Sequence, residues 1–118
     1  MADITIFHNP RCSKSRQAMG EASDAGVDVD EVRYLDAPPD RATLEAIVAK
    51  LEDPVEALIR AGDARKAGLD PKAITGTDAV LDTLDAHPEL MERPLLVRAD
   101  KAIIGRPTER VAPFLAGD

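Results

Sequence analysis

The sequence predicts a single layered domain of the α/β or α+β class. Its hydrophobic pattern reads as strand, helix and strand, followed by a helical middle section, two further strands and a closing helix. The 118 residues are enough to bury one ordinary core. No internal repeat, low-complexity segment or linker divides them. We therefore expect one domain over residues 1–118.

The first three expected elements are a strand, a helix and a second strand. Residues 3–7 alternate apolar and polar side chains, as a short strand does. A helix is predicted over residues 13–25, closed by the glycine that follows. Residues 29–35 form the second strand. The predicted buried face of the helix carries Ala18, Ala22 and Ala25.

The middle of the chain is predicted to be helical. Asp40 is a suitable N-cap, and the apolar residues after it recur at helical spacing. Asp53 and the proline that follows predict a second helix, which ends near Arg60. Thr77 opens a third helix, which ends at His87. The apolar face of the helix after Asp40 consists of Leu44, Ile47, Val48 and Leu51.

The last expected elements are a hairpin and a short helix. Residues 95–97 and 101–104 are apolar runs separated by a short turn, which is typical of two antiparallel strands. Pro107 starts the closing helix, and Pro113 keeps that helix short or kinks it.

Composition limits the partners. With 15 Lys and Arg against 22 Asp and Glu, the net charge is −7, so neither nucleic acid nor an anionic membrane is an expected partner. The start MADITIF lacks the cationic region of a signal peptide, and no segment is long and apolar enough to span a bilayer. We expect a cytoplasmic protein, and a monomer by default.

The only cysteine, Cys12, lies in the run HNPRCSKSR between the first strand and the first helix. Unpaired N–H groups and the helix dipole favour a thiolate over a thiol at this position. The nearby cations Arg11, Lys14 and Arg16 act in the same direction. The alternative is an inert buried cysteine, but such residues do not usually lie among cations and turn formers. Cys12 is therefore a candidate nucleophile.

Three arginines stand at predicted element boundaries: Arg60, Arg93 and Arg106. Each alone is explained as a surface charge. However, Arg93 and Arg106 both precede proline and are separated by one hairpin, which brings them to the same edge of the sheet. Guanidinium groups donate hydrogen bonds in a fixed plane and suit a tetrahedral oxyanion. Placed near Cys12, they would also lower the pKa of its thiol.

These motifs together resemble the glutaredoxin-coupled arsenate reductase family. The resemblance rests on HNPRCSKSR after a strand, a helix-ending Arg60, ERPLLV at 92–97 and GRPTE at 105–109, and it extends to APPDR at 37–41 and to DTLDAHPELMERP. It implies an α/β, thioredoxin-like fold, in which a small mixed four-stranded sheet is flanked by helices and a helical insertion separates strands 2 and 3. Because the chain stops at Asp118, it is similar to the shorter, chromosomal branch.

The resemblance also implies a reaction and its site. Cys12 would be the nucleophile that reduces arsenate to arsenite, and His8 and Ser15 would help to hold its thiolate. For His8, the alternative is a surface histidine that ends the first strand. A cis peptide bond before Pro94 would face the cysteine. The arginines implied to bind arsenate and arsenite are Arg60, Arg93 and Arg106.

Electrons must come from external thiols, since the chain has no second cysteine. The resemblance implies glutathione as co-substrate and glutaredoxin as partner, with no bound cofactor or metal. A protein of the same fold could instead be a glutathione-linked thiol protein without arsenate activity, and this alternative stays open.

Other classes fit less well. The phosphatase-type arsenate reductases need an arginine six positions after the cysteine, where this chain has Ala18. Regulators of the Spx type, which bind RNA polymerase, commonly carry a second cysteine at the position of Ser15. A zinc site built from Cys12, His8 and His87 lacks the spaced ligand pairs that such sites use.

Overall fold

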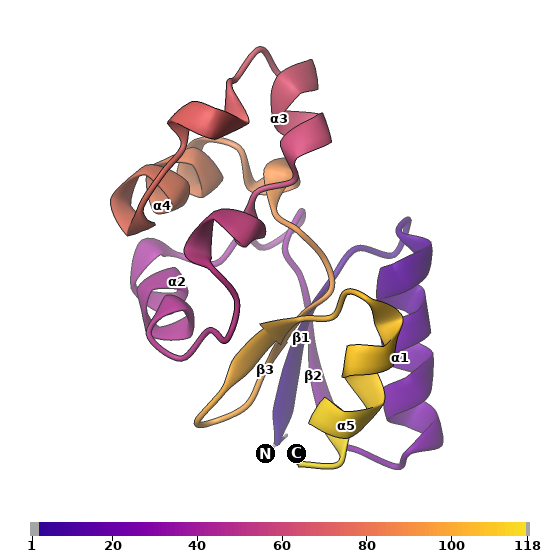
Figure 1. Ribbon diagram of the computed structural model, residues 1–118. Helices are drawn as coiled ribbons and strands as arrows, with labels where there is room; N and C mark the ends of the chain where they lie inside the picture. Colours follow the sequence, from indigo (N-terminus) through magenta and orange to yellow (C-terminus); the bar gives the residue numbers. More distant parts are fainter. Residues whose placement is uncertain (1–2, 118) are drawn as a thin grey trace.

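The computed structural model describes residues 3–117, which contain a four-stranded mixed sheet with helices on both faces (Figure 1). The strand order is β2-β1-β3-β4. Strand β1 (Ile4–His8) pairs in parallel with β2 (Val29–Arg33) and antiparallel with β3 (Leu95–Val97). Strand β4 (Ala102–Ile104) completes an antiparallel hairpin with β3. The predicted sheet and the helical insertion between strands 2 and 3 are confirmed.

Helices α1 (Ser13–Asp24) and α5 (Val111–Leu115) lie side by side on one face of the sheet (Figure 1). Ala25 was predicted on the buried face of α1, but it is exposed because the helix ends there and Gly26 turns the chain at φ +69°. The third buried residue of α1 is Ser15 instead. The core on this side consists of Ile4, Ile6, Ala18, Ala22, Leu96, Ile103, Val111 and Phe114.

The opposite face is covered by α2 (Arg41–Val48), the 3₁₀ turn Val55–Leu58 and α4 (Thr77–Ala86). Asp40 caps α2 as predicted, because its carboxylate accepts the Thr43 N–H at 2.8 Å. Leu51 was expected within this helix, but it lies beyond it and forms a parallel bridge with Ala102. The largest side chains of this core include Phe7, Tyr34, Leu44, Leu58, Leu81, Leu90, Met91 and Leu95.

The prediction of a helix ending near Arg60 is wrong. After the 3₁₀ turn the backbone becomes extended, and Arg60 is the N-cap of α3 (Ala61–Lys66). The cause is a tertiary pairing: Ile59 and Met91 form an antiparallel bridge, in which the Arg60 N–H donates to the Leu90 carbonyl at 2.8 Å. This bridge interrupts the helix and holds Arg60 beside the segment that leads to Arg93.

The remaining boundaries differ slightly from expectation. Strand β2 ends at Arg33, so Tyr34 and Leu35 lie in the turn after it. The closing helix begins as the 3₁₀ turn Thr108–Arg110 and continues as α5, which is short as predicted. Further 3₁₀ turns precede and follow α4, at Pro71–Ala73 and Pro88–Leu90. Within residues 3–117, every helix is too short or too polar to cross a membrane.

Gly105 provides a test of how tightly the hairpin packs. Its N–H donates to the Pro94 carbonyl at 2.8 Å, and a Cβ there would lie 2.8 Å from both Leu96 Cδ1 and Pro94 Cγ. We expect Gly105→Ala to reduce the free energy of unfolding by about 1–3 kcal/mol, the usual cost of overpacking. Urea denaturation measures this change.

The matched control is Gly20→Ala in α1. Gly20 is exposed and has open space around the position of a Cβ, so alanine should stabilise the helix by up to about 1 kcal/mol. Equal stability of Gly105→Ala and the wild type would show that Pro94 and Leu96 can move aside.

Candidate active site

Cys12 is the N-cap of α1 and is only partly exposed. Its N–H donates to the Asn9 carbonyl at 3.0 Å, and its carbonyl accepts the Arg16 N–H at 3.0 Å. These backbone bonds fix the loop between β1 and α1. The sulfur therefore faces the free N–H groups of the first helical turn, those of Lys14 and Ser15.

His8 and Ser15 meet beneath this loop rather than at the sulfur. His8 Nδ1 lies 2.6 Å from Ser15 Oγ, which also accepts the Asn9 N–H at 3.0 Å. Both side chains are buried. Burial lowers the pKa of His8, with Glu31 opposing the shift, so the ring is neutral at neutral pH. His8 thus anchors the loop, and Ser15 reaches Cys12 through its backbone N–H.

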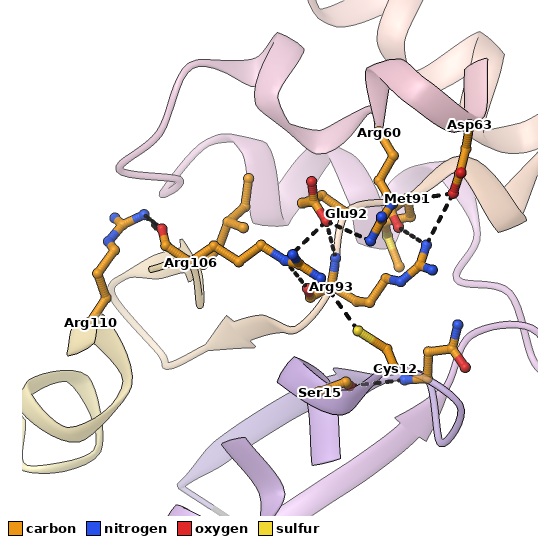
Figure 2. Close-up of polar contacts among 11 residues, drawn as sticks. Cys12, Ser15, Arg60, Asp63, Met91, Glu92, Arg93, Arg106 and Arg110 are labelled. Carbon is orange, nitrogen blue, oxygen red and sulfur yellow. Dashed lines mark hydrogen bonds and ion pairs between the residues drawn. The ribbon is translucent and has the colours of Figure 1, made fainter. Parts of the chain in front are cut away.

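The hairpin brings Arg93 and Arg106 together over Cys12 (Figure 2). Arg106 Nη2 lies 3.3 Å from Cys12 Sγ, and its Nε donates to the Arg93 carbonyl at 2.7 Å. The Arg93 guanidinium also interacts with the sulfur. The peptide bonds before Pro94 and Pro107 are both cis, of which the resemblance implied only the first.

Arg60 completes the group of three arginines, and two carboxylates hold them (Figure 2). Glu92 Oε1 lies 3.4 Å from Arg60 Nη1 and 3.2 Å from Arg106 Nε. Asp63 Oδ2 lies 3.2 Å from Arg60 Nε and 3.6 Å from Arg93 Nη1. The sequence reasoning missed both carboxylates, although Glu92 directly precedes Arg93 and Asp63 is at i+3 from Arg60. Three guanidinium groups thus face two carboxylates and the Cys12 thiolate, so the charges within the site balance.

The environment lowers the pKa of the Cys12 thiol. Partial burial raises it, but the backbone N–H groups of Ser15 and Lys14 and the guanidinium groups of Arg93 and Arg106 outweigh that effect. The exposed cations beside Cys12 in sequence were expected to lower this pKa as well. However, the Arg16 guanidinium donates to the Pro10 carbonyl at 2.9 Å instead.

This shift predicts how the reactivity of Cys12 depends on pH. Because the folded thiol has a lowered pKa, its alkylation rate should rise with pH with a midpoint below the pKa of about 8.5 of a free cysteine. Titrating the thiolate by its ultraviolet absorbance measures the same midpoint. Unfolding the protein in urea should return the midpoint to the free value, and identical folded and unfolded midpoints would contradict the prediction.

His87 lies apart from this site, at the end of α4, where its Nδ1 is 3.3 Å from Glu89 Oε1. Within the described part of the chain, no three His, Cys, Asp or Glu side chains gather in a way that could hold a metal ion.

Comparison with known proteins gives a consistent result. Residues 7–114 match the profile of the ArsC family. The chain is similar to an arsenate reductase of Neisseria meningitidis, with 40% identity over 98% of this chain and 100% of that protein. It is 32% identical to an arsenate reductase of Escherichia coli, over 98% of this chain and 82% of the relative.

A solved arsenate reductase from Vibrio cholerae superposes with a TM-score of 0.78 at 29% identity, over 95% of this chain and 97% of that one. Together with the observed sheet, these similarities confirm the predicted thioredoxin-like fold.

Proposed function

This chain belongs to the ArsC family, and we propose that it reduces arsenate to arsenite through the Cys12 thiolate. The observation that carries the proposal is the 3.3 Å contact between Arg106 Nη2 and Cys12 Sγ, within the group formed by Arg60, Arg93 and Arg106. A thiolate beside guanidinium groups combines a nucleophile with an oxyanion-binding site. Relatives that bear the name arsenate reductase support arsenate as the oxyanion.

In the first step the Cys12 thiolate attacks the arsenic atom of arsenate. A sulfur–arsenic(V) bond forms, an arsenic–oxygen bond breaks, and the oxygen leaves as water after protonation. The arginines hold the anion in line with the sulfur and offset its charge. Although the overall charge is −7, the three guanidinium groups offset the local charges of Glu92, Asp63 and the thiolate, and their N–H groups provide directed donors for the anion.

The second step needs an external thiol. Glutathione sulfur attacks Cys12 Sγ, an S–S bond forms, and the S–As bond breaks with its electron pair passing to arsenic, which leaves as arsenite. Two thiols are oxidised to one disulfide as arsenic(V) gains two electrons. Glutaredoxin then reduces the Cys12–glutathione disulfide, because the sequence contains no other cysteine that could do so.

A groove beside the thiol offers an approach for this reductant. The groove is lined by Asn9 and Arg11 of the Cys12 loop and by Lys66 and Arg93, so that three cations face the two carboxylates of Asp63 and Glu89. Glutathione carries two carboxylates, which cations of this kind attract. We place the reaction in the cytoplasm, where a reducing thiol pool keeps such a cysteine reduced.

The experiment that tests this function couples the reaction to glutathione reductase and follows NADPH consumption. With arsenate, glutathione and glutaredoxin present, we expect consumption that depends on arsenate and is matched by arsenite formed. Omitting glutaredoxin should slow turnover strongly. If the folded protein forms a mixed disulfide with glutathione but makes no arsenite, it is a glutathione-linked thiol protein without arsenate activity.

A further inference from the structure

Tyr34 lies at the same edge of the sheet as the Cys12 loop. Strands β1 and β2 are parallel, and His8 pairs with Arg33 as the last residue pair of the ladder. The next residue on each strand is therefore Asn9 on one side and Tyr34 on the other. Ligands of open α/β sheets bind outside the carboxyl ends of the strands, which is where Tyr34 stands.

The Tyr34 hydroxyl is buried without a partner. The residue has 0% of its surface exposed, and among the described residues its hydroxyl oxygen has no hydrogen-bond partner within 3.5 Å, although the Asn9 side chain lies near enough to act on it. Arg93 Nε is a second buried polar atom without a hydrogen bond. Buried polar groups in folded proteins nearly always have partners, so unpartnered groups beside a reactive thiol require an explanation.

The charges around Tyr34 connect it to the site. Burial raises the pKa of the phenol, the Arg93 guanidinium and the Asn9 side chain oppose this, and the Cys12 thiolate adds to it, so the net shift is upward. The group therefore remains protonated at neutral pH and can act as a donor. Arg60 also lies close enough for its charge to act on the phenol.

We propose that the Tyr34 hydroxyl donates a hydrogen bond to the bound oxyanion, as a fourth side-chain donor beside Arg60, Arg93 and Arg106. This inference rests on the proposed function, because it assumes an oxyanion at the arginines. The anion supplies the acceptor that the buried hydroxyl lacks in the free protein, and another of its oxygens accepts from Arg93 Nε. A neutral donor adds a directed contact without adding charge near the thiolate.

The test is Tyr34→Phe, which keeps the ring in the core and removes only the hydroxyl. In the Cys12→Ser background, where arsenate cannot react, isothermal titration should show that the arsenate dissociation constant rises about 10-fold, the usual loss of a hydrogen bond to a charged group. With Cys12 present, KM for arsenate should rise by a similar factor. The melting temperature without anion should stay equal or increase, since an unpartnered buried hydroxyl is lost.

Thr108→Val is the matched control. Its hydroxyl is also buried without a partner, but it lies in the 3₁₀ turn before α5. This variant should bind arsenate as the wild type does. Unchanged arsenate affinity in folded Tyr34→Phe overturns the inference. The proposed function fails by a different result, namely a wild-type protein that binds arsenate without reducing it.

Discussion

Replacing Cys12 with serine is expected to abolish arsenate reduction, with a loss of roughly 10⁴-fold or more in turnover. A serine hydroxyl stays protonated at neutral pH and cannot form the disulfide that carries electrons from glutathione. The fold should persist, because the bonds that fix this loop use the backbone N–H and carbonyl of residue 12. The coupled NADPH assay measures turnover, and thermal unfolding checks the fold.

Two measurements make this prediction specific. Arsenate should still bind to the Cys12→Ser protein, because all three arginines remain and one negative charge is absent. Adding Ser23→Cys to that variant places a thiol on the exposed side of the same helix, away from the arginines, and should restore no activity. Turnover near that of the wild type in either protein would show that Cys12 is not the nucleophile.

Those parts of the fold that depend on local pattern could be predicted from sequence. Alternation identified β1, and Asp40 with the apolar face behind it identified α2. The hairpin was also predictable, because two short apolar runs with a turn between them have few alternatives. It carried the most useful inference about the site, since antiparallel pairing brings Arg93 and Arg106 to one edge whatever the rest of the chain does.

Features that depend on tertiary pairing could not be predicted in this way. Asp53 and Pro54 indicate a helix start, but the bridge between Ile59 and Met91 stops the helix before Arg60. No local signal contains that bridge, because its partners are far apart in the sequence.

Which cations act on the Cys12 thiol also depends on the folded arrangement. The sequence suggested two sets of cations that would lower the Cys12 pKa, the flanking Arg11, Lys14 and Arg16 and the distant boundary arginines, and the guanidinium groups that do so are those of Arg93 and Arg106. A side chain's direction is set by its packing, so neighbours in sequence can point away from each other. Glu92 and Asp63 were missed because their role as partners of the arginines exists only in the folded arrangement.

Changing Arg106 to lysine is expected to reduce kcat/KM for arsenate roughly 100-fold, although the charge is retained. Arg106 uses separate nitrogens for separate partners. Nε donates to the Arg93 carbonyl at 2.7 Å and lies 3.2 Å from Glu92 Oε1, while Nη2 contacts Cys12 Sγ at 3.3 Å. A lysine ammonium is a single point of charge and cannot contact both sets of partners. It must therefore lose its contact either with the Arg93 carbonyl and Glu92 or with the Cys12 thiolate.

The Cys12 pKa separates these two results of Arg106→Lys. If the ammonium stays with Glu92, the thiolate loses a neighbouring cation and its pKa rises toward the free value; if it moves to the sulfur, the pKa stays low while anion binding weakens. Steady-state kinetics and the thiolate titration together distinguish them. Arg98→Lys is the control, because Arg98 lies over the Phe114 ring at the other end of β3 and should affect stability alone. Wild-type kcat/KM in Arg106→Lys would mean that Arg106 contributes only its charge.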